Sequence, residues 1–350
     1  MIRCPENPLM TPERVQPWLP GFSVECTFNA GVAEYAGEIL LLMRVAEKPP
    51  RAPEGYLNVP VLRNHGGTWQ VDVLTLSRSD PRYDFSDPRK ILDRQIGNYV
   101  YLTSISHLRL ARSTDGIHFT ADPAPFIWPD CALEGFGTED ARIVRIDGTY
   151  WINYTAVSAH GITTALATTR DFVRVEKHGV AFVTENRDVT IFPEKINGKY
   201  YALVRPVPRQ IGGARIWVAE SPDLLHWGNF TPLPLPVFPW SEARTGGGAV
   251  PIRISEGWLI LYHGADRISN RYSMGAALLD AGDPRKVLAA AREPILRAEK
   301  DYETSGFYPN VVFSCGALRE GEMIRMYYGA ADRTIGLASA NIRDLLAMMF

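Results

Sequence analysis

Short runs of apolar and aromatic residues, each preceded by a polar turn, recur along the chain. Four of them begin just after an Asp-Gly, Asn-Gly or Glu-Gly pair, at residues 147–154, 197–204, 256–262 and 320–328. A polar-Gly pair between apolar runs indicates a β-hairpin. A second pattern, a strand of small residues that enters a polar turn carrying Asp or Asn, recurs at residues 110–116, 166–172, 218–224 and 337–343. The chain is therefore predicted to repeat one β-rich unit.

The spacing of the repeat favours a β-propeller. The hairpins recur about every 50 to 65 residues, which suits a four-stranded blade with loop insertions. An earlier unit, from Phe28 through the apolar run 39–45, brings the count to five. A two-sheet sandwich is the competing architecture, but it does not explain the repeat.

Helical periodicity is scarce. Only residues 11–18 and 342–350 are plausible short helices, and extra loops are expected around 46–58 and 79–90. No linker-like or low-complexity stretch divides the chain. The prediction is an all-β protein, a five-bladed β-propeller with short terminal helical segments, in which residues 1–350 form a single catalytic domain.

Composition narrows the class of protein. With 46% hydrophobic and 22% charged residues, the chain has the composition of a soluble globular protein. The net charge of −2 argues against nucleic acid as a partner. No signal peptide is evident and no apolar run approaches a membrane span, so no membrane is expected. The 4 cysteines are widely scattered, which favours reduced thiols in a cytoplasmic protein.

The segment 135–142 carries the strongest candidate for acid catalysis. Glu139 and Asp140 are adjacent carboxylates that follow a glycine pair and precede an apolar run. Neighbours in a strand point to opposite faces, so one can face a pocket while the protein holds the other, with Arg142 as a candidate partner. A carboxyl group in a pocket can donate a proton to a leaving oxygen. The alternative is a surface turn with a salt bridge.

A second group of residues suggests an anion site. Propeller loops converge at one end of the central channel, so residues at strand ends of different units can meet. Three arginines and a histidine occupy such places, and a guanidinium suits phosphate: Arg187, Arg205, Arg244 and His263. The glycines at 246–248 could also let backbone amides approach an anion. Taken singly, each cation has a local explanation, such as an Arg187–Asp188 or Arg244–Glu242 ion pair.

Other polar residues near strand ends are candidate substrate contacts: Asn29, Arg44, Ser106, His107, Glu139, Asp188 and Asp332. No metal site is expected, because the 7 histidines are dispersed and show no HxH or HExxH spacing. No GxSxG nucleophile motif is present.

Several motifs together resemble the inverting β-mannoside phosphorylases of glycoside hydrolase family 130. They are spread over nearly the whole chain, at residues 138–142, 192–199, 204–206, 246–251, 261–264, 309–313 and 329–332. The resemblance also implies a five-bladed propeller, which agrees with the fold predicted from the repeat. The segment 101–109 and the chain length look most like the β-1,2-mannobiose phosphorylases.

The resemblance implies a role for each matching residue. It makes Asp140 the general acid, and Arg187, Arg205, Arg244 and His263 the set that binds phosphate. Asn29, Arg44 and Asp332 look like contacts to the mannosyl ring. Phe307 stands where many relatives carry Asp, and Asn29 lies in Asn-Ala-Gly rather than the more usual Asn-Pro-Ala.

The reaction implied is reversible, inverting phosphorolysis of a β-mannoside, in which inorganic phosphate is the co-substrate and no cofactor is needed. The acceptor side of the substrate is open: a β-1,2-mannobiose, a short β-1,2-oligomannan, or a β-1,4-linked mannosyl-glucose or mannosyl-N-acetylglucosamine. An inverting β-mannosidase and a non-catalytic carbohydrate-binding propeller are the rival readings. Propeller edges and terminal segments could also support a homo-oligomer.

Overall fold

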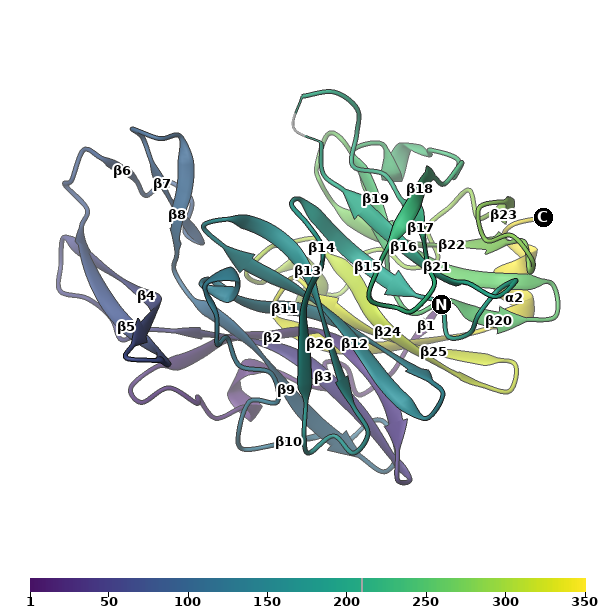
Figure 1. Cartoon of the computed structure of the whole chain (residues 1–350), viewed down its shortest axis with the longest axis horizontal. Helices are drawn as coiled ribbons and strands as arrows, with labels where there is room; N and C mark the ends of the chain where they lie inside the picture. The colour runs from purple at the N-terminus through teal and green to yellow at the C-terminus, as the bar shows by residue number, and fades with distance from the viewer. Residues whose placement is uncertain (209) are drawn as a thin grey trace.

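The computed structural model describes residues 1–208 and 210–350, and its regular structure is mostly β, as predicted (Figure 1). Unit one contains β2 (Ser23–Tyr35), β3 (Glu38–Lys48), β9 (Ile105–Ser113) and β10 (Thr120–Ala121). Unit two contains β11 (Gly137–Ile146), β12 (Thr149–Ser158), β13 (Gly161–Thr169) and β14 (Glu176–Phe182). These units join in one sheet where β11 pairs with β9 through Gly137 and Ser106.

Three further units follow as separate antiparallel sheets. Unit three contains β15 (Asn186–Ile191), β16 (Tyr200–Pro206), β17 (Trp217–Ser221) and β18 (Gly228–Pro232). Unit four contains β19 (Arg244–Gly247), β20 (Ile252–Ile254), β21 (Gly257–Ala265), β22 (Tyr272–Leu279) and β23 (Val287–Ala290). Unit five contains β24 (Val312–Glu320), β25 (Met323–Ala330), β26 (Thr334–Asn341) and the N-terminal strand β1 (Ile2–Arg3), which pairs with β26.

Strands β4 to β8 lie between β3 and β9 and are called the inserted hairpins below. They comprise a pair, β4 (Tyr56–His65) and β5 (Thr68–Ser77), and a small sheet of β6 (Tyr83–Asp84), β7 (Lys90–Asp93) and β8 (Asn98–Leu102). They project from one end of the molecule (Figure 1, left) and have a small apolar core of their own around Val59, Leu76 and Ile91. The expectation of two extra loops here was too modest, because much of this stretch forms strands.

Local turn chemistry explains why the predicted hairpins form. Asp147 and Asn197 each precede a glycine and adopt a φ near 50°, which small polar residues tolerate. The second repeated pattern also has one structural meaning. In three units the Asp carboxylate at the end of the strand accepts two backbone N–H groups of the following turn: Asp115, Asp171 and Asp223.

The hydrophobic core lies between units rather than within one sheet. Buried clusters join units one and two, two and three, three and four, and four and five. A fifth cluster joins unit five to unit one, where Tyr327 and Ile335 pack with Leu41 and Met43. Each sheet thus buries apolar side chains on both neighbours.

The helices are short. The predicted C-terminal helix is present as α2 (Ile342–Ala347), which Asn341 caps by accepting the Arg343 N–H. The predicted N-terminal helix is reduced to a 3₁₀ turn at Pro12–Arg14, and similar turns occur at Ala132–Glu134 and Pro239–Ser241. A four-residue helix that was not predicted, α1 (Asp301–Thr304), precedes β24. Among the described residues, no helix has the length and apolar character needed to cross a membrane.

Candidate active site

Two adjoining hollows of about 590 Å³ and 540 Å³ form one cavity. They share six lining residues: Arg44, Arg89, Lys90, Glu185, Arg187 and Asp332. The first strands of units one, two, three and four each supply a polar residue to the larger hollow: Asn29, Asp140, Asp188 and Arg244. Strands from different units therefore meet at this cavity.

One side of the cavity, called the acid side below, is organised by Arg44. Asp140 Oδ1 accepts hydrogen bonds from Asn29 Nδ2 at 3.0 Å and from Arg44 Nη1 at 3.3 Å. Arg44 also donates to Glu139 Oε1 at 2.7 Å and to Ser106 Oγ at 3.1 Å. One guanidinium thus fixes both adjacent carboxylates and leaves Asp140 on the wall of the cavity.

The expectation that Glu139 and Asp140 would point to opposite faces was wrong. The pairing of β11 with β12 shifts register between Glu139 and Arg142, and Asp140 has a φ of 51°. A bulge of this kind breaks the alternation of a strand and re-aims its side chains. Arg142, the partner expected for a carboxylate, donates instead to the backbone oxygen of Asp140 at 2.9 Å.

The same bulge recurs in two other units. Register shifts interrupt β2 after Phe28 and β15 after Arg187, and Asn29 and Asp188 adopt φ angles of 47° and 54°. Asn and Asp are the side chains that accept this left-handed conformation most readily after glycine. The repeated bulge therefore turns three polar side chains toward the cavity at equivalent places.

The opposite side, called the cation side below, is centred on buried Asp188. Its carboxylate lies 2.9 Å from Arg205 Nη1, 3.4 Å from His263 Nε2 and 3.5 Å from Arg142 Nη2. Arg205 Nη1 also lies 3.4 Å from His263 Nε2. The ion pair of Asp188 is therefore with Arg205, not with its neighbour Arg187 as the local alternative proposed.

Arg244 and Arg187 complete the cation side. Arg244 donates to the Tyr272 hydroxyl and to Asn270 Oδ1, both at 2.9 Å, rather than pairing with Glu242. Arg187 lines both hollows. Within the part of the chain that the structure describes, no protein acceptor takes a hydrogen bond from the Arg187 guanidinium.

The glycines at 246–248 serve packing rather than anion binding. A Cβ on Gly246 would lie 2.5 Å from Asp188 Oδ2, and one on Gly247 would lie 2.7 Å from the Asp188 backbone oxygen. Real Cβ atoms do not approach so closely, so any larger residue would push β19 away from the cation side. The carbonyls of Gly247 and Gly248 accept hydrogen bonds from Arg142.

Burial and neighbouring charge set the protonation of the site. Burial opposes ionisation of Asp188, but the guanidinium groups of Arg205 and Arg142 outweigh it and lower the pKa of Asp188 to about 2. Burial lowers the pKa of His263 to about 3, so the imidazole is neutral at neutral pH. Burial raises the pKa of Asp332 to about 7 against the opposing charge of Arg44, and burial also raises the pKa of Glu139. His263 is therefore a neutral member of the cation side.

The structure brings together all the predicted site residues except one. Ser106 and His107 are consecutive in β9, so they face opposite sides of the sheet. Ser106 reaches the cavity, whereas His107 is fully buried behind it and hydrogen-bonds to Glu47 Oε1 at 2.9 Å. The expectation that His107 contacts substrate is therefore not supported by its position.

Sequence reasoning missed several residues that line the cavity. Arg89, Lys90 and Tyr99 come from the inserted hairpins and their edge, and Asn270, Tyr272 and Tyr308 come from units four and five. None lies in a motif of its own. The Gly306-Phe-Tyr-Pro309 segment, already notable for Phe307, was the available signal for Tyr308.

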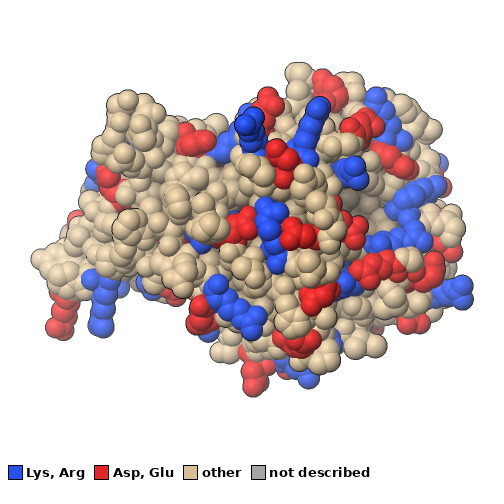
Figure 2. All heavy atoms as spheres, turned by 90° about the horizontal axis from the view of Figure 1, so that it is seen from below, with Lys and Arg blue, Asp and Glu red and all other residues tan. Residues whose placement is uncertain are grey.

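Charge elsewhere on the surface is mixed. In the space-filling view, basic and acidic side chains alternate over the face shown and do not gather into one basic patch (Figure 2). Away from the cavity, Asp130, Cys131 and Glu134 lie close enough together to hold a cation. The Lys177 ammonium occupies that position, donating to Asp130 and Glu134 at 2.8 Å each. All four cysteines are free thiols.

The family model described as β-1,4-mannooligosaccharide phosphorylase, glycoside hydrolase family 130, matches residues 88–350. The chain belongs to this family. The resemblance inferred from the motifs is therefore confirmed.

Two curated relatives in the family act on β-1,2-linked substrates according to their names. The β-1,2-mannobiose phosphorylase of Listeria innocua is 48% identical over 349 residues, which cover 99% of this chain and 97% of the relative. The 1,2-β-oligomannan phosphorylase of a Thermoanaerobacter species is 42% identical over 245 residues, covering 69% of this chain and 80% of the relative.

The solved structure of the Listeria innocua enzyme, in complex with β-1,2-mannobiose, has a TM-score of 0.94. The matched region covers 99% of the present chain and 98% of the chain of the Listeria innocua enzyme. A second solved structure, from work on family 130 hydrolases that target β-1,2-mannosidic linkages in Candida mannan, has a TM-score of 0.74 at 25% identity. The family therefore contains both phosphorylases and hydrolases, and the site must decide between them.

Proposed function

We propose that this family 130 protein catalyses reversible, inverting phosphorolysis of β-1,2-mannobiose or a short β-1,2-oligomannan, which gives α-D-mannose 1-phosphate. The observation that carries the proposal is the division of one cavity into an acid side with Asp140 and a cation side with Arg187, Arg205 and Arg244. Similarity to the Listeria innocua enzyme along nearly the full chain supports the β-1,2 linkage.

The proposed mechanism assigns phosphate to the cation side. Arg187, Arg205 and Arg244 hold it against the anomeric carbon, and neutral His263 adds polarity without adding charge. A phosphate oxygen forms the new bond to the anomeric carbon while the bond to the aglycone oxygen breaks on the opposite face. This displacement inverts the configuration.

Asp140 supplies the proton that the departing oxygen needs, either directly or through a sugar hydroxyl. The proton that phosphate loses on forming the ester restores the balance. Arg44 and Asn29 orient the Asp140 carboxyl group, and Glu139 and Asp332 complete the mannosyl side. The reaction is a transfer of a glycosyl group from one oxygen to another.

The charge distribution supports a phosphorylase rather than an inverting hydrolase. Inverting hydrolysis needs a second carboxylate that activates water across the ring from the acid. Glu139 lies beside Asp140 on the same guanidinium, and Asp188 is engaged by Arg205. The positive charge opposite Asp140 favours an anionic nucleophile.

The direct test is incubation with β-1,2-mannobiose, with and without inorganic phosphate, followed by assay of mannose 1-phosphate. Phosphate-dependent formation supports the proposal. Mannose release at the same rate without phosphate indicates a hydrolase. If phosphorolysis occurs only with β-1,4-linked mannosyl-glucose or mannosyl-N-acetylglucosamine, the protein is still a phosphorylase, but its substrate linkage is β-1,4 and not β-1,2.

We also infer that the five units close as a five-bladed propeller. The inference is supported by the apolar cluster that joins unit five to unit one and by the pairing of β1 with β26. A ring of this kind explains why strands from successive units share one polar cavity. Deletion of residues 1–10 is expected to lower the unfolding temperature strongly, because Leu9 and Met10 belong to that cluster.

A further inference from the structure

A chain of contacts leads from the cation side to the inserted hairpins. Arg244 Nη2 donates to Asn270 Oδ1 at 2.9 Å, and Asn270 Nδ2 donates to the Tyr308 hydroxyl. The Arg89 guanidinium lies over the Tyr308 ring, 5.0 Å from its centroid. All four residues line the larger hollow.

The chain is assembled from three separate parts of the fold. Asn270 lies in the loop between β21 and β22, Tyr308 lies between α1 and β24, and Arg89 precedes β7. Arg89 is itself fixed by Asp87, which accepts its Nε at 3.0 Å and its Nη2 at 2.9 Å. The contacts therefore cross between units and do not merely shape one turn.

Arg244 is held differently from Arg205. Arg205 pairs with the Asp188 carboxylate, whereas no carboxylate of the described residues lies within 4.0 Å of the Arg244 guanidinium. Its side-chain partners, Tyr272 and Asn270, are neutral. Neutral acceptors orient a guanidinium without cancelling its charge, so that charge stays available to an anion.

Arg244, which can only donate, sets the orientation of the Asn270 amide, and the Tyr308 hydroxyl anchors that amide by accepting from Nδ2. With Nδ2 on the hydroxyl, Oδ1 faces the Arg244 donor; the flipped amide would set its NH₂ group against the guanidinium. The left-handed φ of 53° at Asn270 is one that Asn and Gly adopt readily.

We propose that Asn270 and Tyr308 are positioning residues that aim Arg244 at the phosphate, and that stacking of Arg89 on Tyr308 ties the inserted hairpins to this anion site. The inference rests on the proposed function only in taking phosphate as the anion. According to this proposal, the inserted hairpins contribute to the affinity for phosphate. They also form part of the wall of the smaller hollow.

The test compares Tyr308→Phe, which removes one hydroxyl, with Asn270→Gly, which removes the amide and tolerates the positive φ. Each is expected to raise the KM for phosphate about five- to tenfold, the size of one lost ordinary hydrogen bond. The KM for β-1,2-mannobiose and the kcat at saturating phosphate are expected to stay within about twofold, as for a loss of binding alone.

The double variant provides the sharpest readout. If the hydroxyl acts through the amide, adding Tyr308→Phe to Asn270→Gly is expected to change the KM for phosphate no further. Arg89→Met is likewise expected to raise that KM about twofold in the wild-type background and to have no effect beside Tyr308→Phe. If the effects of Tyr308→Phe and Asn270→Gly on the KM for phosphate multiply in the double variant, the two residues act independently. That result would overturn the relay, meaning the proposed action of Tyr308 on Arg244 through Asn270.

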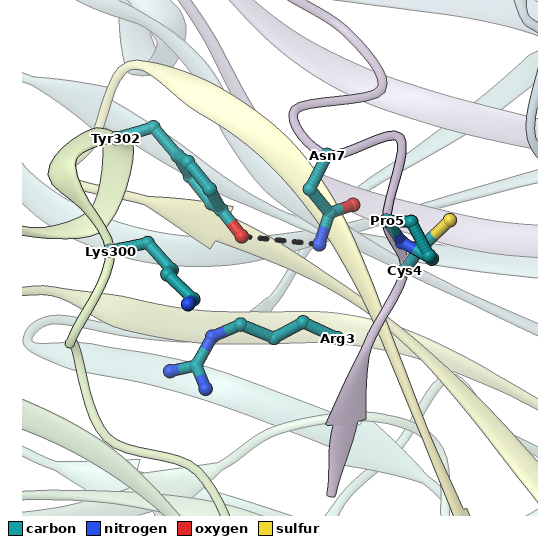
Figure 3. Close-up of a pocket in the computed structure, with 6 residues that line it drawn as sticks. All are labelled: Arg3, Cys4, Pro5, Asn7, Lys300 and Tyr302. Carbon is teal, nitrogen blue, oxygen red and sulfur yellow. Dashed lines mark hydrogen bonds between the residues drawn. The ribbon is translucent and has the colours of Figure 1, made fainter.

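Tyr302→Phe is the matched control. Its hydroxyl accepts a hydrogen bond from Asn7 at 3.2 Å in a separate surface hollow near the N-terminus (Figure 3). This variant loses a comparable tyrosine hydroxyl and is expected to leave both KM values unchanged. An equal rise in the KM for phosphate in Tyr302→Phe would show a general structural effect and overturn the assignment.

A second readout separates this inference from the proposed function. Phosphate is expected to raise the unfolding temperature of the wild-type protein without any sugar present, and to do so less in Tyr308→Phe at the same concentration. Wild-type protein that shows this shift without turnover of β-1,2-mannobiose would contradict the substrate proposal alone. An unchanged phosphate shift in Tyr308→Phe would contradict the relay alone.

Discussion

On the acid side of the cavity one guanidinium, Arg44, contacts two carboxylates, whereas on the cation side one carboxylate, Asp188, lies among Arg142, Arg205 and His263. Each side thus contains one residue of the opposite sign as its organiser. The difference leaves one side with excess negative charge and the other with excess positive charge. A reaction that needs a proton donor and an anionic nucleophile on opposite faces of a sugar matches this division.

The two sides also differ in which residues maintain the structure of the site and which are available to contact the substrates. Arg44 and Asp188 have their charges engaged by protein groups. Among the described residues, Arg187 and Arg244 form no ion pair with a carboxylate, and Asp140 presents a carboxyl group to the cavity. The first pair should govern stability and alignment, and the others the reaction itself.

The largest effect is expected from Asp140→Asn, which removes the proton donor of the acid side. Asparagine keeps the size and accepts the φ of 51°, so the fold should be retained. Phosphorolysis is expected to fall about 10³-fold, within the range for loss of a general acid. The check is initial rate of mannose 1-phosphate formation, with mannobiose binding followed by calorimetry.

Asp147→Asn is the control for that change. Asp147 also has a left-handed φ, 49°, but lies in a surface hairpin turn. The rate of phosphorolysis is expected to be unchanged in Asp147→Asn. If the rate is also unchanged in Asp140→Asn, Asp140 is not the acid.

On the cation side, Arg187→Gln is expected to raise the KM for phosphate about 30-fold, the size of a charge-assisted contact. Stability should change little, because no protein acceptor among the described residues loses a partner. Steady-state kinetics with varied phosphate and thermal unfolding measure the two effects. The exposed Arg174→Gln is the control. A 30-fold loss of kcat with the KM for phosphate unchanged would contradict the assignment.

Asp188→Asn removes the organiser of the cation side while retaining its left-handed backbone. Uncompensated Arg205 and Arg142 are then expected to lower the free energy of unfolding by about 3 kcal/mol without phosphate. Added phosphate should restore more stability to this variant than to the wild type. Thermal unfolding at several phosphate concentrations tests this, and equal shifts in both proteins would contradict the role of Asp188.

The last prediction concerns pH and Asp332. Because the folded pKa of about 7 lies above the ordinary Asp value, the folded state retains a proton that the unfolded chain has lost. Its contribution to stability therefore declines as pH rises from about 4 to 7, by at most about 1.4 kcal/mol per pH unit. Asp332→Asn is expected to gain stability relative to wild type across this window. A pH-independent difference would contradict the raised pKa.

The repeat and its turns could be predicted because their causes are local. Asp-Gly and Asn-Gly pairs determine hairpins, and Asp115, Asp171 and Asp223 each satisfy their own turns. Buried apolar strands then need neighbours, which leads to stacked sheets. Such features depend on a few consecutive residues and survive in the sequence as a pattern.

The orientation of the side chains in the site could not be predicted from local sequence patterns. Asp140 and Glu139 meet on Arg44 because a bulge interrupts β11, and alternation alone gives the opposite answer. The neutrality of His263 depends on burial that no local pattern reveals. Arg89 reaches the cavity only through the placement of the inserted hairpins. These properties arise from contacts between distant segments.

The pairing of β1 with β26 has a consequence for the order in which the molecule is completed during synthesis. Strand β1 leaves the ribosome long before its partner β26, since Ile2 pairs with Ser339. The cluster that joins unit five to unit one likewise needs Tyr327 and Ile335. Until they emerge, Leu41 and Met43 lack part of their cover. A nascent chain is thus exposed to aggregation along this edge, and a short C-terminal truncation should cost solubility before it affects chemistry.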